Sequence, residues 1–246
     1  MNLNFFISIL VLSCLSFITT YLGVWLAYLF KKNRKVMALG MGFSAGIMIM
    51  LSCFELIPEA ASQTGLPLVM TGVLAGVFLI YILNLILPHT HFCQEKGRVS
   101  FKLKTAYLIA FGLVLHDFPE GFALASSYMH SAQSGILVAI SIALHNLPEE
   151  FALAVPLVKT EKKKVLHKMA FISALAEPLG AVAGFLIVVT FLRFNHFLLA
   201  FAAGAMIFIS LHELFPAGKK CQNNQWFIPG FITSVIIFFI LKYFII

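Results

Sequence analysis

The chain has 246 residues, of which 61% are hydrophobic and only 11% are charged, and its mean hydropathy is +0.97. A soluble domain carries about 25% charged residues, so this composition excludes an ordinary soluble protein and indicates a membrane protein. The formal charge of +7 would by itself suggest nucleic acid as a partner, but its placement in short loops between apolar blocks argues against one.

Eight apolar blocks follow one another along the chain. They cover residues 5–30, 36–58, 66–87, 105–128, 134–158, 168–192, 196–217 and 226–245. A helix needs about 20 residues to cross the hydrocarbon core of a bilayer, so each block predicts one transmembrane helix. The blocks occupy most of the chain, and we therefore expect one all-α transmembrane domain over residues 1–246. The first block lacks a basic start and a cleavage site, so we do not expect a signal peptide.

The basic residues predict how the protein is oriented in the lipid bilayer. Fifteen of the 17 fall in four loops that eight spans would place on one side of the membrane. These loops cover residues 31–35, 96–104, 159–168 and 219–220. Loops rich in Lys and Arg stay in the cytoplasm, so we expect both termini outside the cytoplasm, in a multi-pass protein of the plasma (inner) membrane.

Two internal repeats relate spans that would cross the membrane in opposite directions. Residues 115–125 read LHDFPEGFALA and residues 144–154 read LHNLPEEFALA, with eight of eleven positions identical. Residues 43–60 and 201–218 share nine of eighteen positions, including a Glu, a Leu and a Pro. The pattern is typical of inverted-topology repeats. It predicts that helices 1–3 and 6–8 are related, with helices 4 and 5 as a further pair.

Five acidic residues fall well inside the predicted spans, where each ionised group costs about 3 kcal/mol. They are Asp117, Glu120, Glu149, Glu150 and Glu177. The fourth and fifth spans contain no Lys or Arg, so the expected partner of these carboxylates is a mobile cation or protons.

The spacing of the motif residues suits a divalent metal ion. His116 and Glu120 are four residues apart and lie on one helix face, and His145 and Glu149 repeat this spacing. Imidazole and carboxylate without thiolate suit Zn, Fe, Mn or Co better than Cu(I) or Ca. The expected metal ligands are His116, Asp117, Glu120, His145, Asn146, Glu149 and Glu177.

Prolines follow the motif histidines. Pro119 and Pro148 each free the carbonyl four residues earlier, so we expect two interrupted helices whose free carbonyls can join the coordination. A simple kink is the plainer interpretation, and both can hold. Glu177 also precedes a Pro, and it is either a ligand or a buried, protonated acid.

Further polar residues lie at the ends of spans or between them. Glu55 is near the outer end of the second span, and His212 and Glu213 are near the inner end of the seventh. They either mark vestibules of a transport path or are ordinary interfacial residues. The loop segment His89–Cys93 reads HTHFC, and it either hands metal onward or is simply a loop.

The motifs HDFPEG at 116–121 and HNLPEE at 145–150 resemble the paired signature of the ZIP (Zrt-, Irt-like) metal-ion transporters, especially the bacterial zinc-uptake branch. The segments AEPLGA at 176–181 and HELFPAG at 212–218 are similar to that family's sixth and seventh helices. The resemblance implies import of Zn²⁺, and also of Fe²⁺, Mn²⁺, Co²⁺ or Cd²⁺, into the cytoplasm with no cofactor. It also implies a homodimer, which is common in that family.

The resemblance further implies two adjacent metal sites on the fourth, fifth and sixth helices. One site would comprise His116, Glu120, His145 and Glu149, and the other Asp117, Asn146 and Glu177, with Glu120 and Glu149 bridging. Two residues depart from the bacterial pattern. Asp117 stands where Asn is frequent and Glu150 where Gly is usual, and the sequence leaves open whether Glu150 faces the path.

The main alternative is an intramembrane zinc-dependent hydrolase, which would also bury His and Glu to activate a water. The motif H-E-x-x-H is absent, and a duplicated site suggests a path rather than one catalytic pocket, so we expect no enzyme. A metal sensor or a proton-coupled carrier of another solute is a further alternative, and a sensor would need a soluble output domain. Metal binding displaces protons, so uptake is expected to weaken as pH falls, in a carrier or a channel-like path alike.

Overall fold

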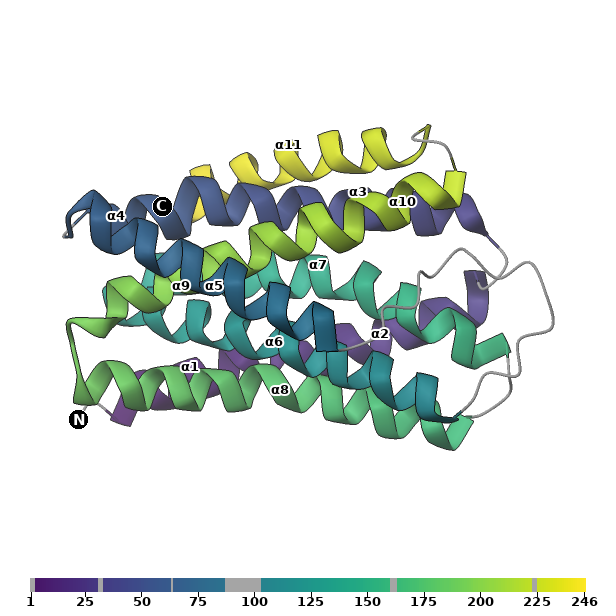
Figure 1. Cartoon of the computed structure of the whole chain (residues 1–246), viewed down its shortest axis with the longest axis horizontal. Coiled ribbons are helices and arrows are strands. Elements are labelled where there is room, and N and C mark those ends of the chain that lie inside the picture. The colour runs from purple at the N-terminus through teal and green to yellow at the C-terminus, as the bar shows by residue number, and fades with distance from the viewer. Residues whose placement is uncertain (1–2, 31–32, 63, 87–102, 160–162, 223–224) are drawn as a thin grey trace.

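The computed structural model describes residues 3–30, 33–62, 64–86, 103–159, 163–222 and 225–246. These residues form a bundle of long helices that run along one axis, and no strand occurs among them (Figure 1). The elements are α1 Leu3–Ser13, α2 Leu15–Phe30, α3 Arg34–Leu51, η1 Ser52–Leu56, α4 Ile57–Ala61, α5 Leu66–Ile86, α6 Leu103–His130, α7 Ala132–Lys159, α8 Lys163–Thr190, α9 Phe194–Ile209, η2 Ser210–Leu214, α10 Phe215–Gln222 and α11 Phe227–Ile245. The expectation of an all-α protein is confirmed over these residues.

Six segments of the described chain are long and apolar enough to cross a membrane. They are Leu3–Phe30, Arg34–Ala61, Leu66–Leu85, Lys163–Thr190, Phe194–Gly218 and Phe227–Ile245. The two motif helices α6 and α7 have 28 residues each but are not among these six. The protein is a multi-pass membrane protein, and the count of eight spans stays a prediction.

The motif helices are continuous at their prolines. Both α6 and α7 are helical on either side of Pro119 and Pro148, so the expectation of two interrupted helices is wrong. One Pro removes a single intrahelical hydrogen bond, and packing against neighbouring helices keeps the remaining turns in place. A break of one residue occurs instead at Cys14, between α1 and α2.

The longer sequence repeat has a local structural counterpart in two π-helical turns. The turns η1 and η2 occupy matching positions of residues 43–60 and 201–218. Each turn ends with a hydrogen bond to a carbonyl oxygen five residues earlier. The N–H of Ile57 donates to the carbonyl of Ser52, and the N–H of Phe215 donates to the carbonyl of Ser210. A Pro follows directly in both cases, and the widened turn relieves the clash of its ring with the carbonyl four residues earlier.

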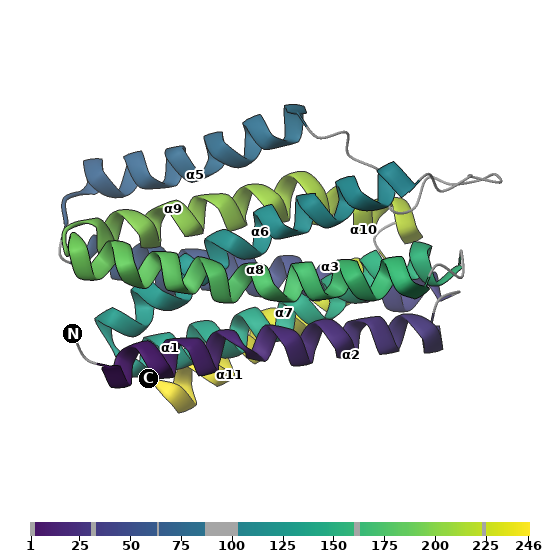
Figure 2. The ribbon, with the colours of Figure 1, turned by 90° about the horizontal axis from the view of Figure 1, so that it is seen from below.

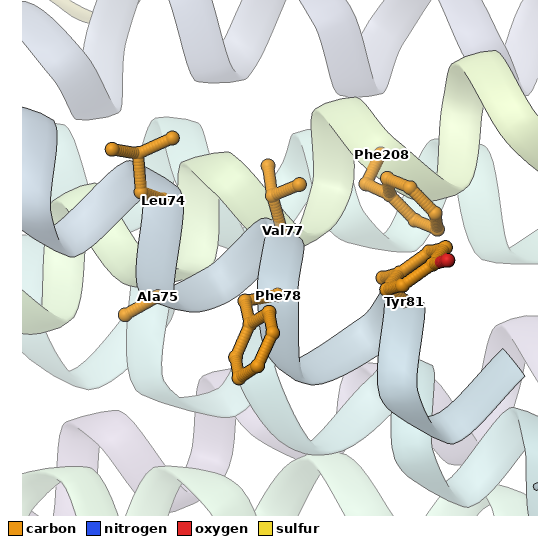
Figure 3. A pocket seen from close by; sticks show the side chains of 6 residues that line it. All are labelled: Leu74, Ala75, Val77, Phe78, Tyr81 and Phe208. Carbon is orange, nitrogen blue, oxygen red and sulfur yellow. The ribbon is translucent and has the colours of Figure 1, made fainter. Parts of the chain in front are cut away.

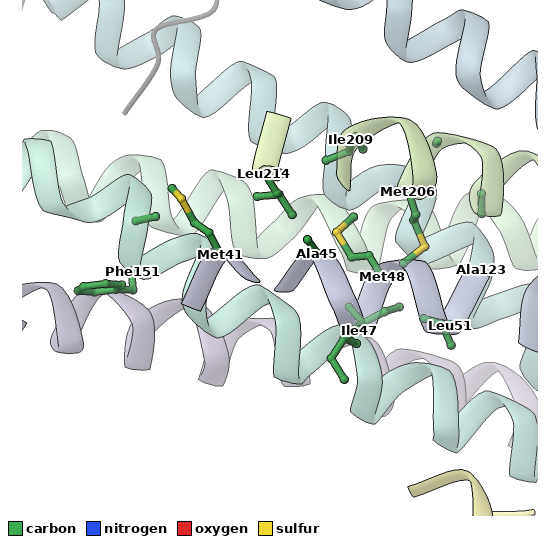
Figure 4. Close-up of a cluster of buried hydrophobic side chains, with 14 of the residues drawn as sticks. Met41, Ala45, Ile47, Met48, Leu51, Ala123, Phe151, Met206, Ile209 and Leu214 are labelled. Atoms are coloured by element: carbon green, nitrogen blue, oxygen red, sulfur yellow. The ribbon is translucent and has the colours of Figure 1, made fainter. Parts of the chain in front are cut away.

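The interior between α3, α7 and α9 is filled by aliphatic and Met side chains (Figure 4). Met41 and Met48 from α3 and Met206 from α9 are at most 1% exposed. Because these side chains are apolar and closely packed, they form the scaffold beside the polar residues of α6 and α7.

Glycines set the distance between several helices. A Cβ on Gly46 would lie 1.8 Å from Oγ of Ser234, and one on Gly204 would lie 2.1 Å from the carbonyl oxygen of Val73. These two glycines therefore permit close packing of the helices on which they lie. Gly46 and Gly204 also occupy matching positions of the longer repeat.

The two ends of the bundle differ in charge. Both termini lie at the same end as α4 (Figures 1 and 2). The starts of α3 and α8, which carry Arg34, Lys35, Lys163, Lys164 and Lys168, lie at the opposite end. We refer to the end with the termini as the terminal end and to the other as the basic end.

Candidate metal-binding site

The two motif helices place Glu120 and His145 against each other in the interior. Nε2 of His145 lies 3.0 Å from Oε1 of Glu120, and both side chains are fully buried. Nδ1 of His145 lies 3.0 Å from the carbonyl oxygen of Ser141, which can only accept, so Nδ1 carries a proton. The contact between Nε2 and Glu120 then holds one more proton, and a metal ion at Nε2 would replace it.

A side chain from α3 holds the second motif carboxylate. Oγ of Ser44 lies 2.8 Å from Oε1 of Glu149 and 3.0 Å from the carbonyl oxygen of His145. Ser44 is fully buried and Glu149 is 6% exposed. The hydroxyl therefore fixes the orientation of Glu149 beside the His145 backbone, as a hydrogen-bonding neighbour commonly does for a metal ligand.

Helix α8 contributes Glu177, which is 2% exposed. Nδ2 of Asn146 lies 3.4 Å from Oε2 of Glu177. With the amide turned over, its nitrogen lies 3.2 Å from Oε2 of Glu120 and 3.1 Å from Nε2 of His145. Asn146 thus sits between Glu177 and the Glu120–His145 pair, and these four predicted ligands come together.

Asp117 and Glu150 approach each other through one hydroxyl group. Oγ of Ser173 lies 2.7 Å from Oδ2 of Asp117 and 2.6 Å from Oε1 of Glu150. A hydroxyl has one proton, so one of these hydrogen bonds is donated by a protonated carboxyl. Oγ1 of Thr20 adds a contact of 3.4 Å to Glu150. Glu150 therefore faces Asp117 across Ser173, in the interior, and not the lipid.

The remaining motif histidine contacts η2. Nε2 of His116 lies 3.2 Å from Oε1 of Glu213, and the two side chains are 15% and 18% exposed. This contact joins Glu213 to the α6 motif. His212, the neighbour of Glu213, is exposed and stacks on the ring of Phe208.

Glu55 contacts a cation from the C-terminal helix. Nζ of Lys242 lies 2.6 Å from Oε2 of Glu55 and also donates to the carbonyl oxygen of Phe54. That carbonyl lies four residues before Pro58 and so lacks the N–H that an ordinary helix would supply. The ion pair agrees with the plainer, interfacial interpretation of Glu55, and a role in the transport path stays a prediction.

The predicted ligand atoms are hydrogen-bonded to one another or to Ser44, Ser173 and Glu213, and they are not arranged around a common centre. Among the described residues, no group of three or more His, Cys, Asp or Glu is arranged to hold a metal ion. Their hydrogen bonds to His, Ser and Asn occupy the atoms that would bind a metal. A metal ion bound here would therefore replace these hydrogen bonds with metal–ligand bonds. The segment His89–Cys93 lies outside the described residues.

A pocket of about 500 Å³ lies on α5 and α9, and it includes the Phe208 ring on which His212 stacks (Figure 3). It is lined by Leu74, Ala75, Val77, Phe78, Tyr81 and Phe208. Except for the Tyr81 hydroxyl its lining is hydrocarbon, so it lacks the ligands that a metal ion needs. Leu74 and Phe78 are about three-fifths exposed, which is typical of a surface in contact with lipid.

Four residues near these contacts were not predicted from the sequence. Thr20, Ser44 and Ser173 carry no metal-ligand spacing, and Ser and Thr are common in membrane helices, so no signal was present. Glu59 is different, because it directly follows the predicted span 36–58, and the structure extends that helical segment to Ala61. An acid at the end of a span is normally interfacial, so the burial of Glu59, which is 8% exposed, had no signal in the sequence.

A helical membrane protein that buries imidazoles together with several carboxylates has the features of a membrane transporter of cations. Residues 88–245 match the family model described as ZIP Zinc transporter. The chain belongs to this family. ZIP proteins are transporters, so this chain is a transporter and not an enzyme, and the intramembrane hydrolase has no support.

Curated relatives cover nearly the whole chain. It is 36% identical over 223 residues to the zinc transporter ZupT of Corynebacterium aurimucosum, which covers 83% of this chain and 84% of the relative. It is 33% identical over 246 residues to ZupT of Streptococcus mutans, with 92% and 93% covered. ZupT of Shigella flexneri is 34% identical over 228 residues, with 88% of each chain covered.

Proposed function

We propose that this protein imports Zn²⁺ into the cytoplasm through two adjacent sites on α6, α7 and α8. The observation that carries the proposal is the buried contact of 3.0 Å between Nε2 of His145 and Oε1 of Glu120. Both atoms are preferred zinc ligands, and they come from the two copies of one sequence motif. The zinc transporters ZupT that resemble this chain over most of its length support zinc as the transported ion.

In this proposal the two sites share the bridging carboxylates Glu120 and Glu149. The first site adds His116 and His145, and the second adds Asp117, Asn146 and Glu177. Asn146 lies near atoms of both sites, which supports their being adjacent. Ser44 and Ser173 do not bind metal in this scheme, and they orient Glu149 and Asp117.

The distribution of charge supports the direction of transport. Loops rich in Lys and Arg stay in the cytoplasm, so the basic end would face the cytoplasm and both termini would lie outside the plasma membrane. Zinc would then enter at the terminal end and leave past Glu213, whose Oε1 lies 3.2 Å from Nε2 of His116.

Inverted repeats would allow alternating access to the two sites. The turns η1 and η2 and the paired glycines Gly46 and Gly204 are local counterparts at matching repeat positions. They support a relation between the first three predicted spans, residues 5–87, and the last three, residues 168–245. Transport of Fe²⁺, Mn²⁺, Co²⁺ or Cd²⁺ and assembly into a homodimer remain predictions.

The proposal is tested by zinc uptake into proteoliposomes that contain an internal zinc-sensitive dye. Wild-type protein should admit zinc down its gradient, and the double variant Glu120→Gln/Glu149→Gln should not. The matched control is His167→Gln, an exposed residue at the basic end, which should transport like the wild type. No zinc entry with folded wild-type protein, or equal entry with the double variant, would overturn the proposal.

A further inference from the structure

A buried carboxylate at the terminal end has an unpaired oxygen. Glu59 lies on α4, and its side chain is 5% exposed. Oγ of Ser127 donates to Oε2 at 3.0 Å, but Oε1 has no hydrogen-bond partner. An unpaired buried carboxylate oxygen is costly, so this arrangement suits a ligand that supplies positive charge.

The nearby ammonium group does not pair with Glu59. Lys242 and Glu55 are both near enough to act electrostatically on Glu59. However, Nζ of Lys242 donates to Oε2 of Glu55 and to the carbonyl oxygen of Phe54. The lysine charge is therefore engaged with the neighbouring acid.

An imidazole lies across from the unpaired oxygen. Nδ1 of His130, at the end of α6, is 3.9 Å from Oε1 of Glu59, which is too far for a hydrogen bond. Zinc binds carboxylate oxygen at about 2.0–2.2 Å and imidazole nitrogen at about 2.0–2.1 Å. The separation of 3.9 Å between Nδ1 and Oε1 is therefore close to the sum of two such bonds. A small rotation of the exposed imidazole would shorten it enough for both atoms to bind one cation at a bent ligand–metal–ligand angle.

We propose that Glu59 and His130 form an outer binding site that captures a divalent cation before it reaches Glu120 and His145. The proposal deepens the proposed function and depends on zinc entering at the terminal end. Oxygen and imidazole nitrogen are a suitable pair for Zn²⁺ or Co²⁺. His130 is 30% exposed, so the cation arrives from solvent over the imidazole and meets the buried carboxylate.

The proposed site has two protein ligands, and among the described residues no group of three or more His, Cys, Asp or Glu is arranged to hold a metal ion. Water completes the coordination, as at open zinc sites. Such a site binds less tightly than a closed one and exchanges quickly, which suits a cation that must move on. Ser127 is a positioning residue here, because it fixes Glu59 through the oxygen that does not face His130.

The test is Co²⁺ titration of the purified full chain, followed by visible absorption and metal analysis. In the Glu120→Gln/Glu149→Gln background one weak Co²⁺ site should remain, and adding Glu59→Gln or His130→Gln should weaken it at least tenfold. The matched control is His167→Gln. This residue lies at the basic end, far from Glu59 and His130, so its substitution should leave Co²⁺ binding unchanged. If the background variant fails to fold, the same comparison is made in wild-type protein, where Glu59→Gln should bind one Co²⁺ fewer.

The outer site is overturned if the background variant binds Co²⁺ equally well with and without Glu59→Gln. It is also overturned if the folded background variant binds no Co²⁺. In proteoliposomes, Glu59→Gln should raise the external KM for zinc several-fold and leave the maximal rate unchanged, and an unchanged KM also contradicts the proposal. If wild-type protein admits no zinc, the proposed function fails, but the Co²⁺ titration still decides on the outer site.

Discussion

Glu120 and His145 are 25 residues apart in the chain, yet Oε1 and Nε2 of these residues lie 3.0 Å apart with no exposure to solvent. The contact joins the two copies of the motif, because Glu120 is the fifth residue of HDFPEG and His145 is the first residue of HNLPEE. Because Nδ1 of His145 is engaged by the carbonyl of Ser141, only Nε2 is available to a metal ion.

Glu120→Gln should abolish zinc uptake while preserving the fold. The amide keeps the shape of the side chain and still hydrogen-bonds Nε2 of His145, but it lacks the negative charge that binds zinc. We expect uptake to fall by more than about 100-fold. Without zinc, thermal unfolding of the variant should begin at the wild-type temperature. Added zinc should raise this temperature much less in the variant than in the wild type. A variant that still shows this rise and transports normally would exclude Glu120 as a ligand.

Ser173→Ala should destabilise the protein. The substitution leaves Asp117 and Glu150, both 5% exposed, without the hydroxyl that contacts each of them at 2.7 and 2.6 Å. A buried group that loses its partner costs about 1–3 kcal/mol, measured as the free energy of unfolding in detergent. The control is Ser8→Ala on α1, which is only half-buried and should change stability by less than about 0.5 kcal/mol. Equal effects would show that Ser173 does not support the two carboxyls.

Gly204→Ala should weaken the packing of α5 against α9. The added Cβ would lie 2.1 Å from the backbone oxygen of Val73, and a backbone atom cannot rotate away. Overpacking of this kind costs about 1–3 kcal/mol in the free energy of unfolding. Gly65→Ala is the control, because its Cβ would meet Cδ of Pro67 at an ordinary 3.5 Å. If the two variants are equally stable, the helices are less closely packed than described.

Zinc uptake should weaken as pH falls. Protons compete with the metal for Nε2 of His145 and for the carboxylate of Glu120, and an ordinary imidazole gains its proton near pH of about 6.5. The apparent KM for zinc should therefore rise as pH is lowered from about 7.5 to about 5.5, with a smaller change in the maximal rate. The measurement is initial uptake at several zinc concentrations with pH equal on both sides of the membrane. A KM that does not change with pH would mean that metal binding displaces no protons.

Much of the fold could be predicted, because hydropathy indicates the long helices and motif spacing indicates which helix faces are polar. The helical class follows from long apolar segments, and the contact of Glu120 on α6 with His145 on α7 agrees with the shared motif. The π-helical turns could not be predicted, since they depend on how Pro58 and Pro216 are accommodated in each packed helix. The continuous helix at Pro119 was also missed, because packing and not local propensity decides whether a membrane helix ends at a Pro.

The contact between the two motif helices was expected from the repeated motifs, whereas the contacts of the motif residues with other helices were missed. His145 and Glu120 follow from the duplicated spacing. Ser44 contacts Glu149 across 105 residues, and no local pattern indicates such a pairing. The partner of Glu55, Lys242, is likewise 187 residues away, so sequence alone could not choose between a vestibule and an interfacial ion pair.

Whether zinc occupies two adjacent positions between α6, α7 and α8 is tested most directly by anomalous X-ray scattering at the zinc edge from crystals of the zinc-loaded protein. We expect two neighbouring peaks that share Glu120, one within about 2.0–2.1 Å of Nε2 of His145 and the other beside Glu177. Zinc peaks confined to other parts of the protein, with Glu120 and His145 still hydrogen-bonded to each other, would contradict the proposed site.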